Sequence, residues 1–305
     1  CRRPVCHQEL RMPNQVQTTT VLGAITAVAV KVRAKEPGEF LQGLMVVLIF
    51  GAMTAEAFFD THMARSWLIC VGLLAFFIAA LGLWIMGDAT GVLISNRNLV
   101  SMSRTQIILW TLIVFPAIFV LAAQKAHYLG GDQALNFAIP REIWGALGIS
   151  IASLVGTPLL LQPKTDQVPS DKALTKTQAA MSDPSQQISA QQISQQSLGT
   201  LFSNPDPSDA RISDMFQGDE VGNAAYVDPA KVQMFVFTLV LVLSYAVSLW
   251  KMFGGITISS DPALRNLQLM AITALPTLSA SQIAVLGISH AGYLSSKAVS
   301  HTDQN

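Results

Sequence analysis

The sequence predicts an all-α integral membrane protein with six transmembrane helices, including a duplicated two-helix hairpin. Three observations support this fold class. Of the 305 residues, 51% are hydrophobic and only 12% are charged, whereas soluble domains carry about 25% charged residues. Several apolar stretches are long enough to cross a bilayer, and one helix entrance recurs later in the chain. We also expect a long disordered cytosolic loop and a short β-like arm at the N-terminus.

Six apolar stretches reach the length that a hydrocarbon core of about 30 Å requires. The strongest is 67–86, which carries no charge and has a tryptophan near each end, where indole rings favour the membrane interface. An amphipathic stretch that Asp261 caps and Pro276 ends is expected to lie along the interface, and Ser279 or Ser281 is expected to cap the last span. The six predicted spans are Phe40–Phe59, Trp67–Met86, Thr105–Gln124, Ile143–Leu161, Val232–Trp250 and Gln282–Val299.

A helical hairpin is predicted to occur twice. Gln106 and Thr111 follow a basic residue at the start of one apolar helix, and Gln233 and Thr238 do so at the start of another. Ser101 and Asp228 stand at matched places before these helices, and both residue types are good N-caps. The second helix of each hairpin contains Leu-Gly-Ile-Ser, at 147–150 and 286–289. The predicted segments are a first hairpin at 40–86, the two repeats at 98–162 and 228–299, and a tail at 300–305.

Residues 163–227 are polar and rich in Ser, Gln, Asp and Pro. Such a composition buries too little apolar surface to offset the entropy of ordering, so we expect a disordered loop whose residues 165–210 can be removed without unfolding the membrane part. Asp214, Asp219 and Glu220 could together bind a divalent cation, but their spacing is not that of a calcium loop. A solvated turn that packs Met215 and Phe216 on the membrane-facing base is the favoured interpretation, and no metal or cofactor is expected.

The N-terminal segment 1–39 has a different pattern. Val28, Val30 and Val32 alternate with polar or small residues, which is the period of a half-buried strand. We expect this arm to end a cytosolic domain that begins upstream of Cys1. Cys1, Cys6 and His7 have the residue types of half a zinc site, but the sequence offers no second half.

The distribution of Lys and Arg predicts the orientation, because these residues are retained on the cytosolic side. With six spans, fourteen of the 19 basic residues fall on the side of the termini and the long loop, and five on the other. We therefore expect a multi-pass protein of the plasma (cytoplasmic) membrane with both termini cytosolic.

Small residues recur four apart in the second helix of each hairpin, a spacing that allows close helix contact in lipid. They are expected to form either the contact between the hairpins or a dimer seam, with ordinary packing as the alternative. These helix-packing candidates are Gly148, Ala152, Gly156, Gly287, Ala291 and Ser295.

Four polar residues inside or near the spans are possible functional residues, because polar groups in a membrane are costly. His290 is a candidate proton relay or cofactor ligand, although a neutral imidazole bonded to a backbone carbonyl near the helix middle is favoured. Glu56 lies near a span end, and Gln106 and Gln233 lie where amides can bridge helices.

The sequence contains no nucleotide-binding glycine loop, zinc helix or nucleophile elbow, so we predict that the protein is not an enzyme. Zero formal charge argues against a nucleic-acid partner. The expected partners are the lipid bilayer, a second copy of the chain, or a cytosolic protein bound by the arm and the loop. A membrane anchor or scaffold is the favoured function. The alternatives are a channel or small-solute transporter built on parallel repeats, and a membrane redox or lipid enzyme.

Overall fold

A computed structural model describes residues 37–181 and 189–303. Within these ranges the chain forms nine α-helices and no β-strand. It divides into two units, Cys1–Phe50 and Gly51–Asn305. Of the first unit, the described part is the beginning of helix α2. The β-like arm and the half zinc site predicted for residues 1–36 lie outside the described residues.

Five of the described helices are long and apolar enough to cross a membrane. They agree with five of the six predicted spans, which confirms the helical, membrane-type composition of the fold. The last helix, α10, is not among the five, so the sixth span stays a prediction. The long helices are α2 (Pro37–Phe59), α3 (Met63–Met86), α4 (Met102–Leu129), α5 (Arg141–Leu161), α8 (Pro229–Gly254) and α10 (Ala280–Ala298).

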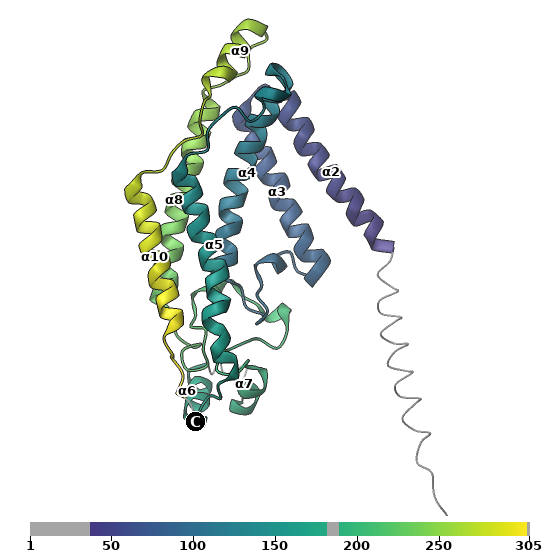
Figure 1. Cartoon of the computed structure of the whole chain (residues 1–305). Coiled ribbons are helices and arrows are strands. Elements are labelled where there is room, and N and C mark those ends of the chain that lie inside the picture. Colours follow the sequence, from purple (N-terminus) through teal and green to yellow (C-terminus); the bar gives the residue numbers. More distant parts are fainter. Residues whose placement is uncertain (1–36, 182–188, 304–305) are drawn as a thin grey trace, which may run out of the picture. The chain divides into compact units, whose positions relative to one another are not determined.

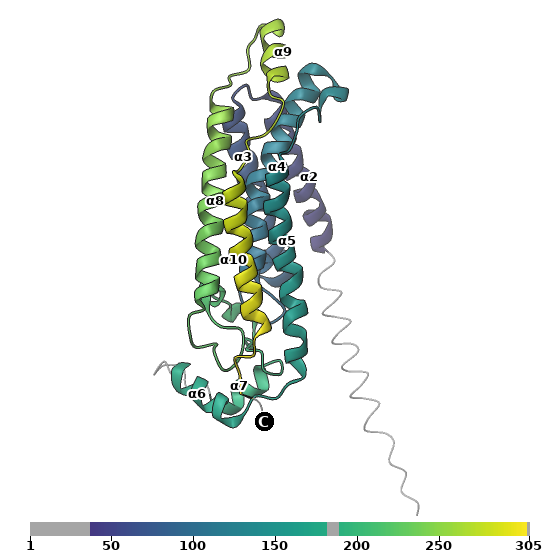
Figure 2. The same cartoon turned by 60° about the vertical axis from the view of Figure 1, so that its left-hand side comes forward.

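Four of these helices form a bundle within the second unit. α4, α5, α10 and α8 pack in a closed order, each against the next, and α3 packs on α4 and α8. Figures 1 and 2 show α5, α8 and α10 side by side along most of their length. The bundle interior contains Trp110 of α4 and Tyr245 of α8, both almost fully buried.

The predicted helix starts are confirmed by their capping bonds. Ser101 and Asp228 accept hydrogen bonds from the first-turn amides of α4 and α8. Asp261 does the same for α9 (Pro262–Ala271), and Ser279 forms a capping box with Gln282 at the start of α10. Each cap satisfies amide groups that a helix leaves without an internal partner.

Matched positions of the two hairpins have different surroundings. Gln106 and Thr238 are fully buried, whereas Gln233 is exposed and Thr111 is half-buried. The connection between α8 and α10 is longer than that between α4 and α5, and it contains α9. The duplication therefore stays a prediction from sequence.

The loop expected to be disordered is folded wherever the structure describes it. It contains α6 (Asp171–Met181), α7 (Ala190–Gln196) and several 3-10 turns. With the segment 87–101 and the tail 299–303, it forms a layer over one end of the bundle, which we call the cap; α6 and α7 lie there beside the C-terminus in Figure 1. The short turns are Gly91–Leu93, Gln162–Asp166, Pro207–Asp209 and Ile212–Phe216.

Two interactions explain why the prediction made from the composition of this loop is wrong. Leu174, Ile193 and Val221 form a small apolar core of their own inside the cap. The tail also binds the loop, because the amide of Ser170 donates to the carbonyl of Asp303 over 2.9 Å. The prediction of disorder is thus wrong for 163–181 and 189–227, since the loop buries apolar side chains of its own and also binds the C-terminal tail.

Candidate functional site

A buried carboxylate, Asp219, holds three cationic side chains at the junction of cap and bundle. Arg97 Nη2 lies 2.5 Å from its Oδ1, Lys231 Nζ lies 3.1 Å from its Oδ2, and Lys297 also contacts Oδ2. The four side chains are at most 10% exposed. Because the cations come from the α3–α4 loop, from α8 and from α10, one cap residue ties three separate parts of the bundle together.

A second buried ion pair lies next to the first. Lys164 Nζ lies 2.6 Å from Glu220 Oε1 and donates to the carbonyls of Lys297 and Val299 over 2.7 and 2.6 Å. Glu220 Oε2 accepts from the amide of His301 over 2.9 Å. Ion pairs inside a protein are costly unless their remaining polar atoms are also paired, and here the C-terminal tail supplies those partners.

The structure gives Asp214, Asp219 and Glu220 separate tasks. Asp214 accepts from the backbone amide of Arg211 over 2.8 Å, and burial raises its pKa. No group of three or more His, Cys, Asp or Glu side chains in the described ranges is arranged to hold a metal ion. The favoured turn agrees with the structure in the packing of Met215, which is buried in an apolar cluster with Met234 of α8 and has Phe216 against it. The turn is not solvated, however, because all three carboxylates are buried.

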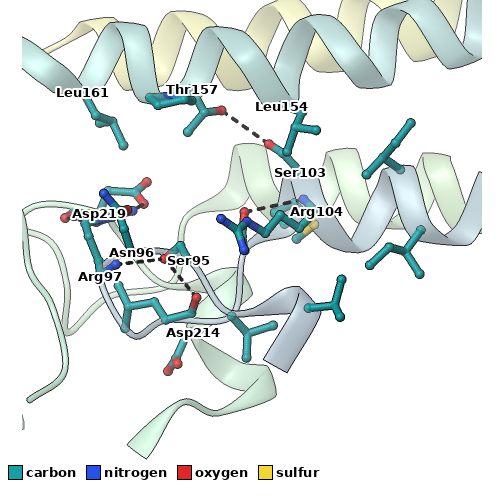
Figure 3. A pocket seen from close by; sticks show the side chains of 18 of the residues that line it. Ser95, Asn96, Arg97, Ser103, Arg104, Leu154, Thr157, Leu161, Asp214 and Asp219 are labelled. Carbon is teal, nitrogen blue, oxygen red and sulfur yellow. Dashed lines mark hydrogen bonds and ion pairs between the residues drawn. The ribbon is translucent and has the colours of Figure 1, made fainter. Parts of the chain in front are cut away.

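A cavity of about 700 Å³ lies beside Asp219, between the start of α4 and the end of α5. One part of its wall is polar, and another part is aliphatic. Figure 3 shows Arg97 and Asp219 in the loops at one end and Leu154 on α5 further along. The residues that line it include Ser95, Asn96, Arg97, Ser101, Ser103, Arg104, Ile107, Ile108, Leu154, Thr157, Pro158, Leu161, Asp214, Asp219 and Tyr293.

Two arginines line this cavity and differ in their partners. Arg97 is paired with Asp219 and also donates to the Asp219 carbonyl over 2.9 Å. Burial lowers the pKa of Arg97 to about 10, which leaves it charged at neutral pH. Arg104 donates to the carbonyl of Ile94 over 2.5 Å and makes no ion pair with a described residue. Its charge is therefore available to a ligand in the cavity.

Polar side chains continue from the cavity into the bundle. At the cavity wall, the Tyr293 hydroxyl lies 3.3 Å from Ser103 Oγ and 3.2 Å from Thr157 Oγ1. About one helical turn further in, at about 1.5 Å of rise per residue, Gln106 and His290 follow on the same two helices as Ser103 and Tyr293. This second level of polar residues is called the polar layer below.

Hydrogen bonds across the polar layer join all four helices of the bundle in pairs. Gln106 Nε2 donates to Thr238 Oγ1 over 2.9 Å, from α4 to α8. Ser153 Oγ and His290 Nδ1 are 2.6 Å apart, joining α5 to α10. His290 thus pairs with a side-chain hydroxyl, where we had expected a backbone carbonyl.

The polar layer and the level beyond it contain buried atoms without a hydrogen-bond partner among the described residues. Unpaired polar atoms in a protein interior cost about 1–3 kcal/mol each, and ordered water commonly binds them. The atoms are Gln106 Oε1, Trp110 Nε1, Tyr245 Oη, Ser289 Oγ and His290 Nε2.

The other polar candidates from the sequence lie apart from this site. Gln233 is exposed on α8 and does not share the buried environment of Gln106. Glu56 is half-buried at the opposite end of the bundle, where it interacts with Asp60. The structure therefore brings Gln106 and His290 to one layer and places the other two elsewhere.

The small-residue positions are divided between two environments. α5 and α10 are neighbours, as the matched stripes predicted. A Cβ atom on Gly156 would lie 3.4 Å from Leu294, and one on Gly287 would lie 3.7 Å from Ile149, so these two face the helix contact. Four positions are exposed instead: Gly148, Ala152, Ala291 and Ser295. For these four residues, a dimer seam stays a prediction.

Sequence reasoning missed the ion cluster around Asp219. One signal was available, since Lys231 and Lys297 lie within a turn of the ends of otherwise apolar helices. We counted both among the basic residues of the cytosolic side. Their shared partner Asp219 lies in a loop that we expected to be disordered and solvated, so spacing alone does not connect them.

Comparison with known protein families, curated proteins and solved structures found no significant similarity. The fold itself defines the class. The described ranges contain five helices that are long and apolar enough to cross a bilayer, which is the composition of a helical membrane protein.

Proposed function

We propose that the protein is a membrane anchor that presents the cap as a rigid interaction surface in the cytosol. The observation that carries this proposal is the pair of buried ion clusters at Asp219 and Glu220. They fix the cap to α8 and α10 by interactions that a mobile loop would not need. The cap is therefore held in one orientation relative to the membrane.

Charge distribution supports the orientation of this surface. The cap end of the second unit carries Arg97, Lys164 and Arg211 among its basic residues, more than the opposite end does. On the positive-inside rule, the cap faces the cytosol. A plasma-membrane location, six spans and cytosolic termini complete the proposal.

Several large apolar side chains on the cap are exposed, and these are suitable contacts for a protein partner. Ile212 is 68% exposed and Val168 is 65% exposed. A photo-crosslinking amino acid at either position should give a discrete adduct with a protein in intact cells. The same amino acid at Leu135, which is 74% exposed at the other end, is the control. If neither Ile212 nor Val168 gives an adduct, the result would contradict the proposal.

A second candidate, a small-solute transporter, is favoured by the cavity and the polar layer. Together they form a polar route that enters the bundle from the cap end. Beyond Trp110, the buried residues of α4 are apolar from Val114 to Ala123, before the buried Gln124 and Lys125 near the other end. The route is thus one-sided in this conformation, which a transporter with alternating access would require and an open channel would not.

Solute or proton flux in liposomes distinguishes this candidate from an anchor. Thr238→Val removes the hydrogen bond that Gln106 donates across the polar layer. A transporter should lose most of its flux in this variant while its assembly is retained. Thr175→Val, on the cap surface, is the matched control. Equal background flux in empty and protein-containing liposomes would leave the anchor as the function.

A further inference from the structure

We propose that the cavity between α4 and α5 binds an anionic phospholipid from the leaflet at the cap end. The ligand chemistry is an anionic headgroup joined to a hydrocarbon chain. This inference goes beyond the proposed anchoring function, which does not require a ligand.

The position of the cavity suits such a molecule. It begins at Ser101, which caps α4, and reaches Leu154, about 10 Å deeper along α5 than Leu161 at about 1.5 Å per residue. The polar wall thus lies at the end of the spans and the aliphatic wall lies inside them. Pro158 lines the cavity and is also exposed on α5, so the cavity reaches the lipid-facing surface.

The charges around the polar end favour an anion. Four cationic side chains line the cavity or contact one of its lining residues, against two carboxylates. Asp219 is already shared among three cations, and Arg104 has no carboxylate partner in the described part of the chain. A phosphate oxygen could accept hydrogen bonds from the Arg104 guanidinium at no cost to an existing ion pair. The cations are Arg97, Arg104, Lys231 and Lys297, and the carboxylates are Asp214 and Asp219.

The size and the apolar wall favour a chain attached to that headgroup. A volume of about 700 Å³ is within the range of about 300–1,000 Å³ typical of ligand cavities. Ile107, Ile108 and Leu154 line the inner part and would cover hydrocarbon. An inorganic anion would leave that part of the cavity unfilled.

The test is native mass spectrometry of the full chain, purified in mild detergent and mixed with equimolar phosphatidylglycerol and phosphatidylcholine. We expect the anionic lipid to be retained preferentially. Arg104→Gln should reduce that preference about tenfold, the effect of losing one charge-assisted hydrogen bond. Arg104→Lys should retain much of it, and Arg141→Gln, at an exposed arginine of the other end, should leave it unchanged.

A second pair of variants tests the hydrocarbon part. Leu154→Trp fills the cavity and should reduce retention of either lipid, whereas Leu159→Trp, on the same helix but 62% exposed, should not. Equal retention of the two lipids by the wild type, or an unchanged preference in Arg104→Gln, would overturn the inference. So would displacement of phosphatidylglycerol by an equal concentration of glycerol phosphate, because the chain would then contribute nothing.

Discussion

Asp219 shows how much of the fold can depend on one side chain. Its carboxylate is the shared partner of three cations from separate segments. Removing one member of a buried ion pair is more damaging than removing the pair, since an uncompensated charge stays inside. At Asp219 three such charges would lose their anion together.

We expect Asp219→Asn to lower the stability of the protein by about 3 kcal/mol or more. Thermal unfolding in detergent measures this, with the exposed Asp166→Asn as control. The double variant Asp219→Asn with Lys297→Gln should recover part of the loss, because it removes one stranded cation. Equal melting of Asp219→Asn and Asp166→Asn would show that the cluster does not hold the cap.

Asp60 gives the connection between α2 and α3 a defined pH dependence. Burial acts to raise its pKa, but hydrogen bonds from the Arg65 guanidinium and the His62 amide outweigh burial and lower the pKa to about 2. An unfolded aspartate titrates near pH 4. A carboxyl group with a lowered folded pKa stabilises the protein above the unfolded pKa, and this contribution is lost as the pH falls to the folded value.

The difference in stability between the wild type and Asp60→Asn should therefore be full above about pH 4 and should shrink as the pH falls towards 2. Chemical unfolding followed at a series of pH values measures it. The comparison isolates Asp60 from other acidic groups, which titrate in both proteins. A difference that stays constant over this range would mean that the carboxylate charge is not the stabilising feature.

At the scale of elements, the cap depends on a tight turn at Gly199, just after α7. Gly199 has a φ of +62°, a left-handed conformation that costs a residue with a side chain about 1–2 kcal/mol. A Cβ atom there would also collide with the carbonyl oxygens of Lys164 and Thr165. Thr200 donates to the Lys164 carbonyl over 3.0 Å, so the turn is part of the contact between cap and α5.

Gly199→Ala should consequently loosen the cap and cost more than about 2 kcal/mol, since the collision adds to the backbone strain. Limited proteolysis of residues 163–227 in detergent detects the change. Gly131→Ala is the control, because a Cβ atom there meets nothing within 4 Å. If Gly199→Ala resists protease as well as the wild type does, the result would support the earlier expectation that the loop is dispensable for folding.

Variants at the contact between α5 and α10 distinguish the two roles predicted for the small residues of these helices, which are contact between the hairpins and a dimer seam. Gly156→Leu should destabilise the monomer, because its side chain would push against Leu294. Gly148→Leu should leave monomer stability unchanged, since Gly148 is exposed. Thermal aggregation and oligomeric state are measured for both. If Gly148→Leu dissociates a dimer without lowering monomer stability, the exposed stripe is the dimer seam.

For the whole molecule, the loop before α4, the long loop and the C-terminal tail, which together form the cap, lie at one end of the second unit. This arrangement agrees with the side assignment that the basic residues predicted for these three segments. Arg97 pairs with Asp219 of the long loop, and Lys164 of that loop donates to the carbonyls of Lys297 and Val299, so these contacts join the three segments at one end.

Single cysteines introduced into a variant without Cys1, Cys6 and the buried Cys70 test the orientation. Gly131 and Ser260 are exposed at the end away from the cap and should be labelled from outside intact cells. Gln191, exposed on α7, should not be labelled. The reverse pattern would show that the protein has the opposite orientation. Labelling at all three positions would show that the number of spans is not six.

The sequence by itself determined the features that depend on neighbouring residues. The apolar stretches give the long helices because a hydrophobic run of this length favours one structure in lipid. The starts of α4, α8, α9 and α10 followed from Ser101, Asp228, Asp261 and Ser279, whose side chains act within three residues. Predicting these helices and their starts required no knowledge of tertiary contacts.

Only the tertiary structure decided the order of the cap, the cavity and the ion clusters. Asp219 and Glu220 are acidic residues in a polar loop until Arg97, Lys164, Lys231 and Lys297 approach from other parts of the chain. The energy that orders such a loop comes from pairs distant in sequence, and composition counts only the cost of its own residues. For the same reason, the sequence proposed His290 and Gln106 as separate candidates, and the packing of four helices placed them in one buried layer.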